Sequence, residues 1–200
     1  MTSLTVDVHE NTAVSHPHEL HVLPLVSHPN CQRMHILFKP AAGGGLSSGI
    51  TDVCAIAAPD AQMYTCEPRG FEKMRRSLAE GCRLSNDRAS GSICDALLAP
   101  MPGVLPFEVL QRRAARGLSV SDDEVKEAMR IAFAHLRLIL EPGGAAALAA
   151  ALSADFRSTL KNRVTIVIAS GGNVDPHFFA EVITSPTPVP PLPPTADLDS

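Results

Sequence analysis

Two apolar runs in this chain each end in a cluster of glycines, and this pattern constrains the fold more than any other. Residues 36–38 are followed by the triplet Gly43-Gly44-Gly45, and residues 164–169 are followed by Ser170-Gly171-Gly172. Residues 63–66 form a third short apolar run. Apolar runs that alternate with helical patterns are typical of a parallel sheet covered by helices. We therefore predict an α/β fold with a partial, open parallel sheet and flanking helices.

The segments between these runs show helical periodicity. Residues 46–57, 71–80 and 145–152 are predicted to be helices. The strongest pattern begins at Ser121, which forms a capping box with Glu124, and its apolar positions recur until Ile139, before Pro142. The apolar face of this helix is expected to pack on the sheet.

The composition allows one folded domain. A chain of 200 residues with 45% hydrophobic residues can bury a single ordinary core. Residues 1–33 are predicted to be a loose N-terminal arm. They hold five of the eight histidines, whose spacing fits no defined metal site. Residues 34–183 are predicted to be the domain, and residues 184–200 a disordered, proline-rich tail whose PxxP spacing alternatively suits an aromatic groove.

Charge and cysteine content exclude several classes of function. The net charge is -4 and 19% of residues are charged, so we expect no nucleic-acid partner and no membrane partner. The five cysteines form no CxxC pair, which argues against a disulfide framework and favours a cytoplasmic protein. A small molecule is the expected ligand.

The first glycine cluster has the properties of an anion site. A strand that leads into Gly43, Gly44, Gly45 and the helical residue Leu46 presents consecutive backbone N–H groups at a helix start. Taken alone, a glycine triplet is also compatible with a flexible turn. The pattern is suited to a bound phosphate.

Four segments, taken in order, resemble the C-terminal part of one enzyme family. They are Gly43-Gly44-Gly45, Glu67-Pro68, Glu141-Pro142-Gly143-Gly144 and Ser170-Gly171-Gly172-Asn173. The family is that of the threonine/serine dehydratases, fold-type II pyridoxal-phosphate enzymes that include serine racemase and hydroxyaspartate ammonia-lyase. The resemblance covers about residues 34–183 and implies the C-terminal part of the tryptophan synthase beta-like fold.

The resemblance assigns cofactor contacts to both glycine clusters. Gly43, Gly44, Gly45 and Leu46 would cradle the phosphate of pyridoxal 5'-phosphate, although Ala42 replaces the first of the family's usual four glycines. Ser170 would hydrogen-bond the pyridine nitrogen, and Gly171 would let the backbone approach the ring. Glu141 would lie near the ring as a possible catalytic residue, whereas its spacing alone indicates the end of a helix before a Pro-Gly turn.

The same resemblance implies a divalent metal site that this sequence alters. In the family, the equivalent of Glu67 binds Mg or Mn together with the backbone carbonyl at the position of Phe71 and an aspartate six residues after the glutamate. Lys73 occupies that sixth position here. An ammonium group repels a hard cation, so the metal site is expected to be lost or weakened. Glu67 would then pair with a nearby cation, or be an ordinary surface carboxylate.

The predicted activity is that of a threonine/serine dehydratase-like ammonia-lyase, which converts a hydroxy-amino acid to a 2-oxo acid and ammonia. The family's Schiff-base lysine segment and its substrate-carboxylate segment do not occur in the sequence, and Lys39 is expected to be a surface lysine. The enzyme is therefore expected to be incomplete, and to form a homo-oligomer or to need a complementary N-terminal chain. The alternative is a catalytically inactive truncated relative that acts as a vestigial or partner-binding module.

Overall fold

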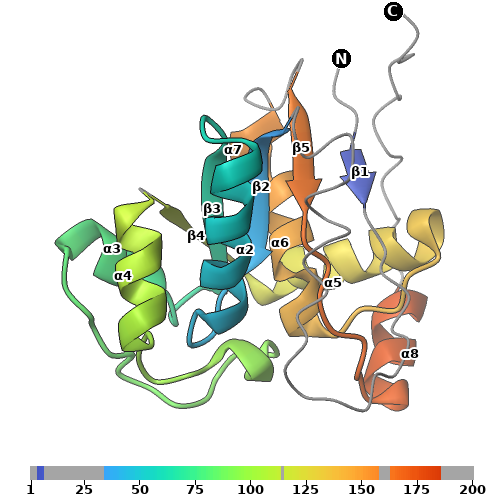
Figure 1. The fold of residues 1–200 in the computed structure, drawn as a ribbon. Coiled ribbons are helices and arrows are strands. Elements are labelled where there is room, and N and C mark those ends of the chain that lie inside the picture. Colours follow the sequence, from blue (N-terminus) through green and yellow to red (C-terminus); the bar gives the residue numbers. More distant parts are fainter. Residues whose placement is uncertain (1–3, 7–33, 114, 158–162, 186–200) are drawn as a thin grey trace, which may run out of the picture.

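The fold contains one five-stranded parallel sheet (Figure 1). A computed structural model describes residues 4–6, 34–113, 115–157 and 163–185. The strands are β1 Leu4–Val6, β2 Met34–Pro40, β3 Gln62–Pro68, β4 Arg116–Val120 and β5 Val164–Val167. Their order across the sheet is β1-β5-β2-β3-β4, and every pair of neighbours is parallel. The predicted open parallel sheet is confirmed.

Two of the strands were not predicted from the sequence. β4 has the sequence RGLSV, which is too short and too polar for a strand pattern, and it is held by pairing with β3 from Tyr64 to Pro68. β1 lies within the segment predicted to be a loose arm and pairs with β5. The other residues of that arm, with its histidines, and residues 186–200 of the proline-rich tail lie outside the described residues.

Seven α-helices and two shorter helical segments connect the strands of the described chain. They are α2 Gly45–Ala57, α3 Lys73–Glu80, the 3-10 helix η1 Asp95–Leu97, α4 Val104–Arg112, α5 Asp122–Ile131, the π-helical turn η2 Ala132–Leu136, α6 Pro142–Leu152, α7 Ala154–Arg157 and α8 Pro176–Thr184. The predicted helices in residues 46–57, 71–80 and 145–152 are confirmed as α2, α3 and α6. The helices α4, α7 and α8 were not predicted from the sequence.

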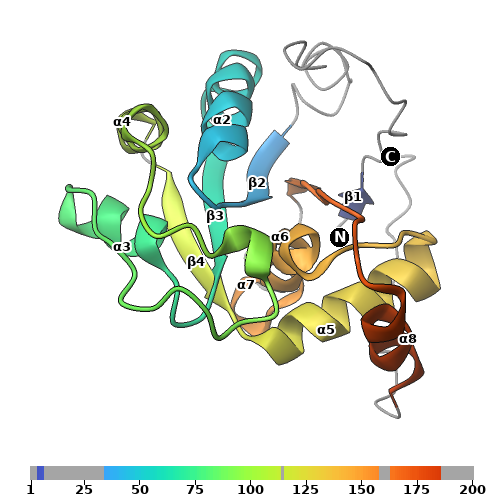
Figure 2. The ribbon, with the colours of Figure 1, turned by 90° about the horizontal axis from the view of Figure 1, so that it is seen from below.

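Helices cover both faces of the sheet, so the domain has three layers (Figure 2). On one face, α2, α3 and α4 pack on Leu37 and Met63. On the other face, α5, α6 and α8 enclose a second core that contains Phe38 and Tyr64, whose rings stack with centroids 5.3 Å apart. The alanine-rich α6 is buried along nearly its whole length, because its small side chains allow it to lie between the sheet and α5. This central helix begins at the site described below.

The helix that begins at Ser121 is shorter than the sequence pattern indicated. The capping box is present: Glu124 N donates to Ser121 Oγ, and the Glu124 carboxylate accepts from Ser121 N. Regular α-helix ends at Ile131, and η2 ends where Arg137 adopts a left-handed backbone with φ 61°. Ile139 therefore lies outside the helix and is 54% exposed, although its spacing fitted the apolar face.

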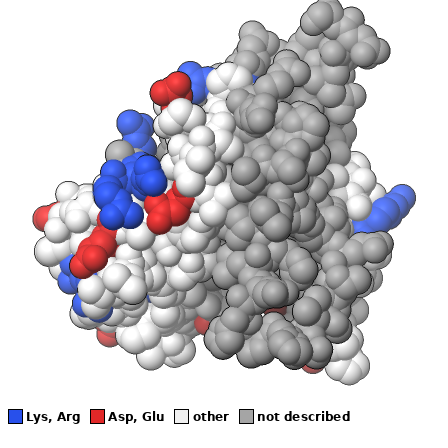
Figure 3. Space-filling model, viewed as in Figure 1, with Lys and Arg blue, Asp and Glu red and all other residues white. Residues whose placement is uncertain are grey.

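Charges of both signs lie side by side on the face shown in Figure 3. Asp52 on α2 pairs with Arg112 and Arg113 at the end of α4, with N–O distances of 3.7 and 3.0 Å. Such exposed pairs contribute little stability. Within the described ranges, no helix has both the length and the apolar character needed to cross a membrane.

Candidate functional site: a cavity at the carboxyl ends of the strands

The first glycine cluster forms the turn between β2 and α2. Gly44 is the N-cap of α2 and has φ 97°, a conformation that glycine adopts without strain. No side chain caps the helix start, and no acidic residue lies in its first turn. The first N–H groups of a helix have no partner within the helix and carry partial positive charge. The start of α2 therefore offers unpaired donors to an anion.

The three glycines of this turn have different surroundings. A Cβ atom built on Gly44 would lie 2.7 Å from Met74 Cε and 2.8 Å from Pro106 Cβ, so close packing with α3 and α4 requires glycine there. A Cβ atom on Gly43 or Gly45 would meet no atom of the chain within 4 Å. Packing within the chain therefore does not require glycine at these two positions, and the space beside them is open.

The second glycine cluster follows β5 and approaches the start of α6. A Cβ atom on Gly144 would lie 1.7 Å from the carbonyl oxygen of Ser170. Gly171 has φ 82°, and its Cβ would lie 2.4 Å from Glu141 Oε1. These two glycines allow the loop after β5 to touch the first turn of α6. The result is that Ser170 and Glu141 lie on one cavity wall.

Glu141 does not end a helix, as its spacing had suggested, but is the N-cap of α6. Pro142 occupies the first helical position, where its missing N–H costs nothing, so the Pro-Gly signal marks a start. The Glu141 carboxylate accepts from Asn173 N at 3.2 Å, and Glu141 N donates to Gly171 O at 3.1 Å. A carboxylate in this position is stabilised by the helix dipole.

The two glycine clusters line one cavity of about 190 Å³. Its lining combines the turn before α2, the 3-10 helix η1, the start of α6 and the loop after β5. The lining residues are Pro40, Ala42, Gly43, Gly44, Gly45, Leu46, Ser47, Ala96, Leu97, Glu141, Gly143 and Ser170. All the predicted cofactor-contact residues except Gly171 line this cavity, and Gly171 O accepts a hydrogen bond from Glu141 N. Cavities at the carboxyl ends of parallel strands are the usual ligand sites of such sheets.

Comparisons with known proteins identify the family of the chain. Residues 26–171 match the family model described as "Pyridoxal-phosphate dependent enzyme". The chain belongs to this family. It is 36% identical over 141 residues to phenylserine dehydratase of Ralstonia pickettii, covering 70% of this chain and 43% of that protein. It is 29% identical over 153 residues to serine racemase of Dictyostelium discoideum, covering 76% of this chain and 47% of the racemase.

A solved structure supports the same assignment. The processed threonine deaminase isoform 2 of Solanum lycopersicum superimposes with a TM-score of 0.69 at 30% identity, covering 76% of this chain and 43% of that chain. The resemblance to the threonine/serine dehydratases and to their fold-type II architecture is thereby confirmed. The chain spans a little under half the length of the curated relatives it matches.

The cavity fits the cofactor that the family implies. The open space at Gly43 and Gly45 lies beside the unpaired N–H groups of α2, which suit a phosphate. Ser170 offers a hydroxyl on another wall of the same cavity. These residues would hold the phosphate and a ring nitrogen respectively, and bound pyridoxal phosphate would supply an electron sink for chemistry at the substrate's α-carbon.

The predicted metal site does not fit a metal ion. Glu67 is fully buried, so the expectation of a surface carboxylate is wrong, and the alternative of a paired carboxylate is confirmed. Its Oε1 lies 3.2 Å from Lys73 Nζ. The carbonyl of Phe71 accepts from Lys73 N at 2.9 Å. Among the described residues, no group of three or more histidine, cysteine or acidic side chains could hold a metal.

The prediction that Lys39 lies on the surface was also wrong. It was expected on the surface at the end of β2, but it is 0% exposed. Strand alternation places it beside Leu37 on the face covered by α2. Among the described residues, no group forms a hydrogen bond with Lys39 Nζ. Burial lowers the pKa of Lys39 to about 8, an effect partly opposed by the nearby thiols of Cys66 and Cys54.

Ala96 and Leu97 in the η1 wall of the cavity were not among the predicted cofactor contacts, although residues 92–97 resemble a family segment that approaches the substrate side of the cofactor. They are held at the site by contacts of Lys73 and Gly143 with Leu97. The link from Gly103 N to Gly43 O, at 2.8 Å, also joins the following loop to the glycine turn. Such long-range contacts leave no periodic signal in a sequence.

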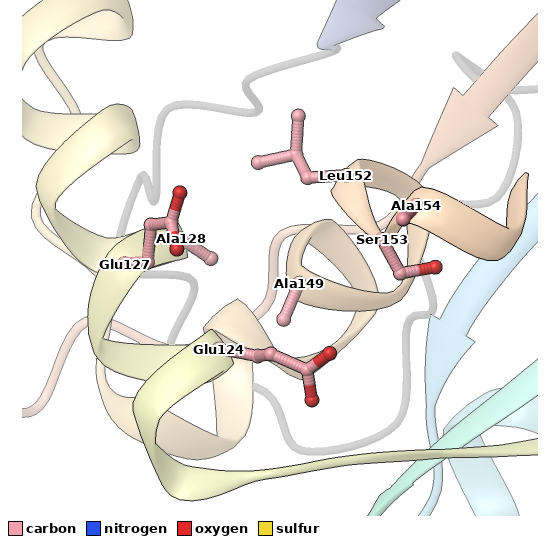
Figure 4. Close-up of a pocket in the computed structure, with 7 residues that line it drawn as sticks. All are labelled: Glu124, Glu127, Ala128, Ala149, Leu152, Ser153 and Ala154. Carbon is pink, nitrogen blue, oxygen red and sulfur yellow. The ribbon is translucent and has the colours of Figure 1, made fainter. Parts of the chain in front are cut away.

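A second cavity, of about 180 Å³, lies between α5 and the end of α6 (Figure 4). The carboxylates of Glu124 and Glu127 point in different directions there. Glu124 is already used in the capping box and pairs with Arg69 at 3.7 Å. This cavity offers no convergent set of polar groups.

Proposed function

We propose that this chain binds pyridoxal 5'-phosphate and forms part of an ammonia-lyase active site for a small hydroxy-amino acid. The observation that carries the proposal is the cavity in which the open glycines 43 and 45, Ser170 and Glu141 come together. Support also comes from the relatives, which include phenylserine dehydratase and "beta-hydroxyaspartate dehydratase". The products would be a 2-oxo acid and ammonia.

Each part of the cavity has one role in this proposal. The N–H groups at the start of α2 bind the phosphate dianion, and Ser47 stiffens the turn because its hydroxyl donates to the carbonyl of Pro40. The Ser170 hydroxyl donates to a ring nitrogen and leaves that nitrogen largely unprotonated, which favours elimination over transamination. Glu141, held by Asn173 N, positions the loop that carries Ser170 and presents a carboxylate beside the ring.

We propose that a second polypeptide segment completes the site. The turn that binds the phosphate is flanked by apolar side chains that are exposed to solvent: Leu46 at 48%, Val104 at 52% and Leu105 at 72%. They lie in the first turns of α2 and α4, which are joined through the contact of Gly44 with Pro106. A complementary chain or a second copy that covers them would also close the cavity to water. The same surface supports the alternative function, a partner-binding module without turnover.

Titration of the purified chain with pyridoxal phosphate tests the proposal. We expect saturable binding of one equivalent, measured by absorbance, competition by inorganic phosphate, and at least about tenfold weaker binding of pyridoxal, which lacks the phosphate. Borohydride reduction and peptide mapping then show whether one lysine is trapped. Absence of saturable binding, or equal affinity for pyridoxal, would contradict the proposed phosphate site.

Replacement of Gly43 by alanine separates cofactor binding from folding. The new methyl group meets no atom of the chain, so the Tm should not fall. It would occupy the space of the phosphate and block one charge-assisted hydrogen bond, so the Kd for pyridoxal phosphate should rise about tenfold or more. Ile56→Ala on the same helix is the control, because Ile56 is exposed and does not line the cavity, and the Kd of this variant should stay unchanged. A Gly43→Ala variant with wild-type affinity would place the phosphate elsewhere.

A further inference from the structure

The ammonium group of Lys73 lies where three separate elements meet. Its Nζ donates to Glu67 Oε1 at the end of β3, at 3.2 Å, and to the carbonyl of Leu97 in η1, at 2.9 Å. The side chains of Lys73 and Glu67 are both 0% exposed. A buried cation with two oxygen partners from distant parts of the chain is a cross-link rather than a surface ion pair.

The Glu67 carboxylate also accepts hydrogen bonds from the start of α3. Oε1 accepts from Met74 N at 3.0 Å, and Oε2 accepts from Arg75 N at 2.8 Å. Glu67 therefore caps α3 from a neighbouring strand, where no local side chain does so. The ammonium of Lys73 is the third donor to this carboxylate, and it occupies the position beside Oε1 that a divalent ion would need.

We propose that Lys73 replaces the divalent cation of the family as the positive charge at this place, and that it holds the η1 wall of the cavity without any metal. Lys73 is thus a positioning residue that acts on the cavity through Leu97. This proposal concerns a cation site and does not depend on whether the chain binds pyridoxal phosphate.

A change in the position of Leu97 would alter the cavity directly. Ala96 and Leu97 line it, and a Cβ atom on Gly143 would lie 3.3 Å from Leu97 Cγ. The η1 wall thus packs directly against the first turn of α6, with no spare space between them. Loss of the bond from Lys73 to the Leu97 carbonyl would release this wall from β3 while leaving the glycine turn in place.

The first test is Mn²⁺ binding by the unmodified chain. We expect no binding heat in isothermal titration calorimetry, and a Tm that changes by less than about 1 °C with either Mn²⁺ or EDTA, because no ligand set is free. Stoichiometric Mn²⁺ binding that raises the Tm, or a Tm that falls with EDTA, would overturn the proposal whatever the variants show.

The second test restores the family's carboxylate. Lys73→Asp places a third oxygen ligand beside Glu67 and the Leu97 carbonyl, so saturating Mn²⁺ should raise its Tm by about 5 °C or more. Lys73→Met has no ligand atom there and should show no rise. Lys126→Asp, at a partly exposed lysine of α5, is the matched control and should also show none. If Lys73→Asp does not fold, Lys73→Asn supplies a neutral ligand oxygen in its place.

Hydrogen exchange distinguishes positioning from general stability. In Lys73→Met, the peptide containing η1 should lose protection more than peptides from α5 or α6, and Mn²⁺ should not restore it. In the aspartate or asparagine variant, Mn²⁺ should restore protection at η1. Protection at η1 that is unchanged in Lys73→Met, or an aspartate variant with no better Mn²⁺ binding than Lys126→Asp, would show that Lys73 does not hold this wall.

Discussion

Replacement of Lys73 by methionine is expected to lower the free energy of unfolding by about 3–5 kcal/mol. The change removes the ammonium from a fully buried carboxylate and leaves the Leu97 carbonyl without its donor. Removing one partner of a buried ion pair is costly, because the remaining charge has lost both its water and its partner. Urea denaturation of the variant and the unmodified chain at pH 8 measures this difference.

The pH dependence identifies Glu67 as the origin of this cost. Burial raises the pKa of Glu67, although Lys73 and the N–H groups of Met74 and Arg75 lower it in part. Without Lys73 its pKa in the folded state rises further above the unfolded value, so the cost increases with pH and should be smaller at pH 5.5 than at pH 8. The double variant Glu67→Gln, Lys73→Met carries no buried charge and should recover part of the loss, because the glutamine oxygen can accept from only one of the Met74 and Arg75 N–H groups. Equal losses in the single and double variants would show that the charge of Glu67 is not involved.

The strands and loops that form the cavity could be predicted from the sequence, but most contacts between the residues that line it could not. The apolar runs identified β2, β3 and β5, and the glycine clusters identified the two loops at their carboxyl ends. These features are local, because a glycine turn after a strand is recognisable without knowledge of its neighbours. β4 was missed because its five residues depend on pairing with β3, and α8 because its apolar pattern is short.

The misjudged side chains share one physical cause. Lys39 was predicted at the surface, and a surface carboxylate was one of the two alternatives for Glu67, because charged residues are rarely buried. Only the arrangement of the sheet and its helices shows that each lies in an interior layer. The prediction that Glu141 ends a helix was wrong for a related reason. A Glu-Pro-Gly segment is compatible with the end of one helix or the start of the next, and contacts with the loop that carries Ser170 decide between them.

Within the part of the chain that the structure describes, Lys39 and Lys73 are both buried, but their charges have different surroundings. Lys73 keeps its charge beside a carboxylate and a carbonyl, and links β3, α3 and η1. Lys39 has nearby thiols but no hydrogen-bond partner within the described structure. A buried ammonium without a partner opposes folding unless it loses its proton. One lysine therefore stabilises the architecture around the cavity, and the other destabilises the strand that leads into the glycine turn.

Replacement of Lys39 by methionine is expected to stabilise the chain by about 3 kcal/mol at pH 7. A lysine with a pKa of 10.5 in the unfolded chain and about 8 in the folded chain opposes folding by that amount when it is protonated in both states. Methionine keeps most of the aliphatic volume and has no charge to desolvate. Urea denaturation at pH 7 measures the gain, and Lys126→Met, on the partly exposed side of α5, should change stability by less than about 0.5 kcal/mol.

The same gain should disappear as the pH rises. The penalty is complete below pH 8, where the folded chain must carry the charged amine, and it fades between pH 8 and about 10.5, because the folded chain releases its proton first. Burial also raises the pKa of Cys66 and Cys94 to about 12, which lowers the stability of both proteins above pH 9. The informative quantity is therefore the difference between variant and unmodified chain at pH 7 and at pH 10. A difference that is the same at both values would mean that Lys39 has found a partner for its charge, and that its burial does not oppose folding.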